Sequence, residues 1–233
     1  MSNNFIIAID GPAGSGKSTT AKKLAQKLGY LYIDTGAMYR AITFLALRSN
    51  VTGDEKKIIE LAENSDIELN FIDGETKIRV NGEDLTSDIR TLEVNRNVSD
   101  VSKIAKLRHI LVKKQREMGT TSNGVVMEGR DITTVVFPDA DLKVYLTASI
   151  EERAKRRAKE YAEKGIEVPI EEIKKNLENR DVIDSNRKVS PLTKAEDAVE
   201  IDTSELTIEE QVNKILQKAK KLADAKGIKL NLK

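Results

Sequence analysis

Residues 5–19 read FIIAIDGPAGSGKST, and they place a strand, a loop and a helix in that order. The apolar run 5–9 is typical of a strand buried on both faces of a parallel sheet. The glycine-rich segment that follows fits no regular element. Apolar residues then recur at helical spacing over 21–28, and Gly29 stands where a glycine commonly ends a helix.

The loop matches the pattern G-x-x-x-x-G-K-[ST] in full over 11–18. Its glycines let several backbone N–H groups face inward, and the helix N-terminus adds its positive end. Lys17 supplies a cation for β and γ phosphates, the Ser18 hydroxyl suits Mg²⁺, and Thr19 adjoins the α phosphate. The motif predicts that a nucleoside triphosphate is bound by Gly11, Pro12, Ala13, Gly14, Ser15, Gly16, Lys17, Ser18 and Thr19. It leaves open what is done with that nucleotide.

Strands and helices alternate along the rest of the chain. Further strands are expected at 31–33, 125–127, 142–146 and 198–201, and helices at 37–48, 101–118, 150–165, 169–183 and from 208 onward. Two capping-box patterns, Ser149 to Glu152 and Thr207 to Glu210, mark two of the helix starts. The order predicts an α/β fold over 1–233, with a doubly wound parallel five-stranded sheet flanked by helices.

Residues 63–100 have a different pattern of apolar and polar residues from the rest of the chain. Apolar and polar residues alternate over 67–72 and 77–80, and Asp73-Gly74 and Asn81-Gly82 are turn signals. We predict a small antiparallel insert at 63–100 that is partly separate from the parallel core.

Composition excludes several classes of function. Lys and Arg number 39 against 38 Asp and Glu, which argues against general nucleic-acid binding. The chain has no cysteine, which excludes disulfides and cysteine-ligated zinc, and its single histidine argues against His-rich metal sites and most histidine-based catalysis. The apolar run at 5–9 is too short to cross a membrane, and we expect a cytoplasmic protein with no membrane partner. The lysine-rich end of the chain is interpreted as a solvated helix face.

Arginines outside the loop point to phosphoryl transfer. The sequence lacks the base-reading motif N-K-x-D, which argues against a GTPase switch. The apolar strand expected at 125–127 is followed by the acidic residue Glu128, so the class of ATP-driven machines is not excluded. Forked guanidinium groups suit the many oxygens of two nucleotides, and an ionised acceptor phosphate needs no general base. The candidates are Arg40, Arg130, Arg153, Arg156, Arg157, Arg180 and Arg187. Any one of them could instead form a solvated ion pair.

Four segments, 9–18, 34–40, 128–138 and 180–187, resemble bacterial cytidylate kinases in order and over nearly the whole chain. The resemblance implies a P-loop nucleoside monophosphate kinase, with ATP and Mg²⁺ as donor and cofactor and with CMP and dCMP as acceptors. It also implies that 63–100 is the monophosphate-binding (NMP-binding) region and 153–170 a helical lid, in a protein that is a monomer.

Individual roles follow from the same resemblance. The implied catalytic residues are Lys17, Arg40, Arg130 and Arg157. Arg153 and Arg157 are implied to close over ATP. The residues implied to bind the acceptor are Thr35, Arg40, Ser99, Arg108, Arg130, Asp131, Arg180, Asp184 and Arg187. Within that set, Arg40 and Arg130 hold the phosphate, Arg180 and Asp184 the ribose, and the cytosine pocket is lined by Ser99, Arg108, Asp131 and Arg187. Glu128 departs from the family pattern, in which a relative has Asp.

Purely structural roles remain open for single residues, and other functions remain open for the whole chain. Ser99 could be a helix N-cap, Arg108 a solvated residue, and Asp10 a support for the loop. A kinase of another small acceptor, such as a sugar or shikimate, has less need of both Arg40 and Arg130. A nucleotide-responsive binding module would show no turnover.

Overall fold

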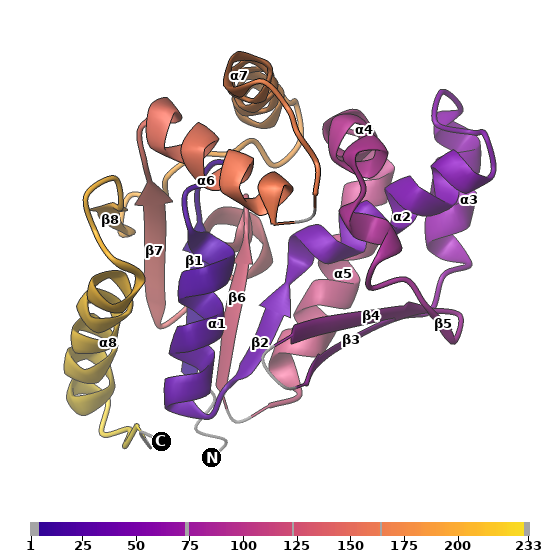
Figure 1. The fold of residues 1–233 in the computed structure, drawn as a ribbon. Coiled ribbons are helices and arrows are strands. Elements are labelled where there is room, and N and C mark those ends of the chain that lie inside the picture. Colours follow the sequence, from indigo (N-terminus) through magenta and orange to yellow (C-terminus); the bar gives the residue numbers. More distant parts are fainter. Residues whose placement is uncertain (1–4, 73–74, 123, 164, 231–233) are drawn as a thin grey trace.

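The computed structural model describes residues 5–72, 75–122, 124–163 and 165–230. Its centre is a five-stranded sheet in the order β2–β6–β1–β7–β8, and every neighbouring pair is parallel (Figure 1). The strands are β1 (Phe5–Asp10), β2 (Leu31–Asp34), β6 (Gly124–Gly129), β7 (Leu142–Thr147) and β8 (Val199–Asp202). The predicted parallel sheet is therefore confirmed.

Side chains of β1 contribute to two hydrophobic cores, one on each face of the sheet. Phe5, Ile7 and Ile9 pack with apolar residues of α1 (Lys17–Leu28) and α8 (Ile208–Ala225). Ala8 belongs to the core on the other face, with residues of α5 (Ala105–Thr120) and of a π-helical segment, Ile132–Val136. Helices thus cover both faces, as the continuous apolar run predicted.

Local signals at two helix ends are confirmed. Gly29 ends α1 with φ 63°, and its N–H donates to the carbonyl of Gln26 at 3.2 Å. Thr207 caps α8 in a complete capping box with Glu210. Helix α2 (Thr35–Arg48) begins directly after β2.

The insert is antiparallel only in its first half. Strands β3 (Ile67–Ile72), β4 (Glu75–Val80) and β5 (Glu83–Asp84) form the expected small sheet. Asn81 and Gly82 make the turn between β4 and β5 with φ 51° and 81°. The other expected turn, Asp73-Gly74, lies outside the described residues.

The second half of the insert corrects the prediction. A 3₁₀ turn, Asp88–Arg90, is followed by α4 (Leu92–Ser102), and α5 begins only at Ala105, so the helix expected at 101–118 is two helices. Val94, Val98 and Val101 are buried at helical spacing, which outweighs their preference for strands. Helix α3 (Glu55–Glu63), which the sequence analysis did not predict, precedes the small sheet.

Two further helices lie beyond the carboxyl ends of the parallel strands (Figure 1). They are α6 (Ile150–Ala162) and α7 (Ile170–Asn186), and they pack on each other through a small core around Ala154, Ile173 and Leu177. Ser149 caps α6 by accepting from the N–H of Glu152 at 3.2 Å. Over the described parts of the chain, no helix combines the length and apolar character that crossing a membrane requires.

Candidate active site

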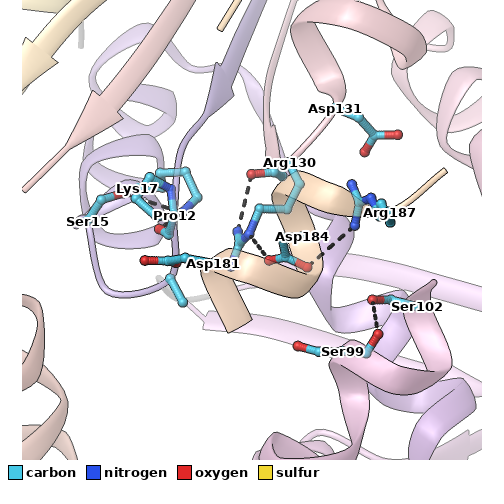
Figure 2. Close-up of polar contacts among 12 residues, drawn as sticks. Pro12, Ser15, Lys17, Ser99, Ser102, Arg130, Asp131, Asp181, Asp184 and Arg187 are labelled. Atoms are coloured by element: carbon cyan, nitrogen blue, oxygen red, sulfur yellow. Dashed lines mark hydrogen bonds and ion pairs between the residues drawn. The ribbon is translucent and has the colours of Figure 1, made fainter. Parts of the chain in front are cut away.

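The glycine-rich loop joins β1 to α1 at the carboxyl edge of the sheet. A Cβ atom at Gly11, where φ is 149°, would lie 2.0 Å from the carbonyl oxygen of Leu146, so only glycine fits against β7. Lys17 opens α1, and its Nζ turns back to donate to the carbonyl of Pro12 at 2.6 Å (Figure 2). The loop is thus curled around the lysine side chain.

The Lys17 ammonium group is buried and short of counter-charge. Burial, with the nearby guanidinium of Arg130, lowers the pKa of Lys17 to about 7. The Glu128 carboxylate accepts a 2.7 Å hydrogen bond from the Tyr32 hydroxyl, and burial together with the charge of Asp34 raises its pKa. An anionic group placed at the loop would restore the pKa of Lys17.

A cavity of about 490 Å³ opens at this loop and extends between α2, α4, α5 and α7. Among the described residues, ten basic and five acidic side chains line it, which suits a ligand with several negative charges. The predicted site residues in its wall are Ala13, Gly14, Lys17, Ser18, Thr19, Thr35, Arg40, Ser99, Arg108, Arg130, Asp131, Arg157, Arg180, Asp184 and Arg187. The other loop residues, Gly11, Pro12, Ser15 and Gly16, shape the turn without lining the cavity.

Carboxylates hold the arginines nearest the loop. Asp34 caps α2 by accepting from the N–H of Ala37 at 3.1 Å, and its other oxygen accepts from Arg40 at 2.8 Å. Burial opposes the charge of Asp34, but Arg40 and Arg90 outweigh it and hold the pKa of Asp34 below its usual value. Arg40 is therefore set in place before any ligand arrives.

A second carboxylate, Asp184 of α7, joins two more of the predicted arginines. It accepts from Nε of Arg130 at 2.9 Å and lies 3.5 Å from Nη1 of Arg187 (Figure 2). Burial and the charge of Arg130 lower the pKa of Arg180 to about 10, and burial and Arg108 lower that of Arg187 to about 10. Both stay protonated near neutral pH, so the cluster carries surplus positive charge.

The far end of the cavity has a buried pair. Arg108 is 1% exposed and Asp131 is 3% exposed, and Nη2 of the arginine lies 2.7 Å from Oδ2 of the aspartate. The guanidinium also donates to the carbonyl of Ser102 at 3.0 Å and stacks 5.0 Å from the ring centre of Tyr39. The interpretation of Arg108 as a solvated residue is wrong. Ser99 lies within α4 and lines the cavity, so it is not a helix N-cap.

Not all the arginines that the sequence singled out meet at the cavity. Arg153 donates to the carbonyl of Ala13 at 3.1 Å and pairs with Asp181 at 2.6 Å, which ties the loop to α6 and α7. It is not among the lining residues. Arg156 donates to the carbonyl of Thr203 at 2.7 Å. Arg157 does line the cavity and pairs with Glu160 at 2.8 Å.

Comparison with known proteins agrees with this geometry. The family model described as cytidylate kinase matches residues 7–221. A cytidylate kinase of Desulforamulus reducens is 55% identical over 217 residues, covering 93% of this chain and 97% of that protein. The cytidylate kinase of Bacillus subtilis (strain 168) is 51% identical over 218 residues, with the same two coverages of 93% and 97%. The chain belongs to the cytidylate kinase family.

Membership of the cytidylate kinase family confirms the predicted enzyme, a nucleoside monophosphate kinase with ATP as phosphate donor. Among solved structures, an uncharacterized protein from Eubacterium ventriosum ATCC 27560 aligns with a TM-score of 0.50 at 12% identity. That alignment covers 93% of this chain and 98% of the other, and it is a likeness of fold alone.

For this member of the cytidylate kinase family, sequence reasoning missed several cavity residues. Lys22 lies one helical turn after Ser18, on the same face of α1, so helix periodicity could have found it. Arg90 and Tyr39 also line the cavity. No motif or spacing relates Arg90, which lies in the insert, to the glycine-rich loop. Tyr39 could have been found from its position, because it directly precedes Arg40 on α2.

Proposed function

We propose that this enzyme transfers the γ-phosphoryl group of ATP to CMP, and also to dCMP, giving ADP and CDP or dCDP in pyrimidine nucleotide metabolism. The observation that supports it most is one cavity shared by the glycine-rich loop, Arg40 and Arg130. A kinase of an uncharged acceptor would not need so many guanidinium groups beyond the loop. The cytidylate kinases to which the chain is similar act, by their names, on cytidylate.

The donor end of the cavity is assigned to ATP. We assign residues 11–19 to the triphosphate, with Lys17 beside the β and γ phosphates. The Lys17 Nζ atom now lies 2.6 Å from the carbonyl oxygen of Pro12. Bound phosphates would replace this carbonyl as the partner of the ammonium group. Arg157 would meet ATP from α6, and Arg153 would act on ATP through the loop, since it donates to the carbonyl of Ala13.

Mg²⁺ is proposed to enter with ATP. The Ser18 hydroxyl lines the cavity beside the carboxylate of Glu128, and a hydroxyl with nearby carboxylates fits a hard cation that also takes phosphate oxygens. Ser18 would hold the ion, and Glu128 would orient its water ligands. Bound there, Mg²⁺ would neutralise charge on the phosphates.

The acceptor end is assigned to CMP. Arg40 and Arg130 would grip its phosphate, with the Thr35 hydroxyl beside them, while Arg180 and Asp184 would bind the ribose. Cytosine has an exocyclic amine that donates and O2 and N3 atoms that accept. Its pocket would be formed by Ser99, Arg108, Asp131 and Arg187, which line the same cavity.

The chemistry then needs positioning and charge stabilisation. An oxygen of the CMP phosphate bonds to the γ phosphorus, and the bond to the bridging oxygen breaks with its electron pair left on ADP. The attacking oxygen is already ionised, so no side chain has to remove a proton. Arg130, whose charge helps to lower the pKa of Lys17, would stabilise charge on the group in transit.

Closure is proposed to complete the site. The insert at 63–100 carries Arg90 and Ser99, and it would move toward the monophosphate; the segment 153–170 carries Arg157 and would cover ATP. Closing both would exclude water and suppress hydrolysis of ATP. We also propose that the enzyme is a cytoplasmic monomer.

An assay of ADP release tests the proposal. CMP, dCMP, UMP, AMP, GMP and dTMP are each offered with ATP and Mg²⁺, and a reaction without any monophosphate measures hydrolysis. We expect the highest kcat/KM for CMP, with dCMP also used. Preference for AMP or dTMP would overturn the assignment, and nucleotide binding without stimulated ADP release would make the chain a binding module.

A further inference from the structure

Asp10, the last residue of β1, directly precedes the phosphate loop but does not turn its carboxylate toward it. The side chain is fully buried. Its Oδ1 accepts from the N–H of Ile132 at 3.0 Å, and its Oδ2 accepts from the N–H and the hydroxyl of Thr133, both at 2.7 Å. These three hydrogen bonds reach across 122 and 123 residues to the segment just after Asp131.

The two N–H groups that Asp10 accepts from are the first of the π-helical segment Ile132–Val136. The N–H of Thr133, the second residue of the segment, is one that the side chain at the N-cap commonly accepts from, and aspartate is among the best residues for that task. Asp131 occupies the N-cap position here, yet its side chain makes no capping hydrogen bond. It lies 2.7 Å from Nη2 of Arg108 instead.

We infer that Asp10 is a positioning residue for recognition of the acceptor base: it caps the segment in place of Asp131 and so frees the Asp131 carboxylate to face the base pocket. The inference rests on the proposed function, in which Asp131 contacts cytosine. It assigns Asp10 to the acceptor side of the site, although its place in the sequence associates it with the donor loop.

The backbone of Asp131 is restrained on both sides. Its own carbonyl accepts from the N–H groups of Val135 and Val136 at 2.9 and 3.0 Å, and Asp10 holds the N–H groups that follow it. Two residues before Asp131, Gly129 pairs with Asp10 in the parallel register of β1 and β6. The Cα atom of Asp131 therefore has little freedom, and its side chain is aimed before any ligand binds.

Electrostatics agrees with this role. Burial raises the pKa of Asp10 to about 6, although its hydrogen bonds from Thr133 and Ile132 oppose the shift. Near neutral pH the group is therefore ionised, and an ionised carboxylate can accept all three hydrogen bonds. An amide in its place could not, because its NH₂ group would face another donor.

The test compares Asp10→Asn with two substitutions of its partner, Thr133→Val and Thr133→Ser. Steady-state kinetics give kcat and KM for CMP and UMP at saturating ATP, and KM for ATP at saturating CMP. Lost hydrogen bonds weaken positioning by roughly 2–10-fold each. We expect Asp10→Asn to lower the ratio of kcat/KM for CMP over UMP by about 10-fold or more, with KM for ATP changed by less than about 3-fold.

The threonine pair keeps the inference testable if Asp10→Asn fails to fold. Thr133→Val removes one of the three hydrogen bonds and should lower the CMP over UMP ratio by about 3-fold, while Thr133→Ser keeps the hydroxyl and the ratio. An unchanged ratio in Thr133→Val, or a larger effect of Asp10→Asn on ATP than on CMP, would overturn the inference. A wild-type enzyme that does not prefer CMP would instead refute the proposed function.

Discussion

The carboxylate of Asp184 accepts a 2.9 Å hydrogen bond from Nε of Arg130, and this contact joins the end of β6 to α7 across 54 residues of sequence. Burial disfavours the charge of Asp184, but Arg130, Arg180 and Arg187 together hold its pKa below the usual value. The carboxylate therefore keeps several guanidinium groups close to one another in the absence of a ligand. Its charge offsets part of their mutual repulsion.

Asp184→Asn should destabilise the enzyme as well as weaken catalysis. Removing one partner of a buried ion pair leaves uncompensated charge and costs roughly 3–5 kcal/mol. Denaturant unfolding should show a lower free energy of unfolding of that order, and added phosphate should recover part of it. Glu83→Gln, which breaks the exposed pair with Arg48, is the control and should leave the unfolding midpoint nearly unchanged. Equal effects of the two substitutions would contradict the role of Asp184.

Arg130→Met should lower kcat/KM for CMP by about 100-fold or more, the scale for losing one buried group that stabilises developing charge. Met keeps the apolar stem of the side chain but removes the guanidinium, which also leaves Asp184 without its hydrogen bond from Nε. Steady-state kinetics with CMP varied at saturating ATP measure the effect. Arg116→Met is a control, because Arg116 donates to the carbonyl of Val136 and does not line the cavity. A loss under about threefold at Arg130 would remove it from the site.

Asp131→Ala should weaken discrimination between bases more than it weakens ATP binding. The substitution leaves the buried guanidinium of Arg108 without its carboxylate at 2.7 Å, and cytosine without an acceptor for its amine. The ratio of kcat/KM for CMP over UMP should fall, while the dissociation constant for ATP stays within about threefold. Equal effects on both ligands would exclude Asp131 from the base pocket.

Much of the fold could be predicted because its signals are local. The apolar run of β1, the glycine-rich loop and the capping residues Gly29 and Thr207 each act within a few residues of their own position. Helix α4 was missed because its valines favour strands and because hairpin signals precede it. Only burial against the rest of the molecule shows that Val94, Val98 and Val101 lie on one helix face.

The site could be predicted less completely, since its geometry depends on contacts distant in sequence. Motifs and the family resemblance identified many of the residues that line the cavity, including Arg40 and Arg130. They could not show that Arg153 turns instead to Ala13 and Asp181, because a shared helix face does not say what lies opposite it. The hydrogen bonds between Asp10 and Thr133 likewise join segments that no spacing rule relates.

Gly11→Ala should prevent correct closure of the loop on the sheet. At this residue φ is 149°, which side chains rarely adopt, and the added Cβ would lie 2.0 Å from the backbone carbonyl oxygen of Leu146. We expect a clear loss of thermal stability and of ATP binding together. Gly53→Ala is the matched control, because no atom of the described residues lies within 4 Å of a Cβ there. Similar losses in both variants would show that the close approach of the loop to β7 is unimportant.

Binding of ATP should take up a proton above neutral pH. In the free enzyme, burial and Arg130 lower the pKa of Lys17 to about 7, so at pH 8 the group is mostly neutral. Phosphate groups beside it favour the ammonium form and raise that pKa again, so binding is coupled to protonation. Calorimetry at pH 8 in two buffers of different ionisation enthalpy should show uptake approaching one proton, and at pH 6 much less. The affinity for ATP should fall by about tenfold per pH unit as the pH rises well above 7. Lys17→Met should abolish both effects, and uptake that persists in that variant would assign the proton to another group.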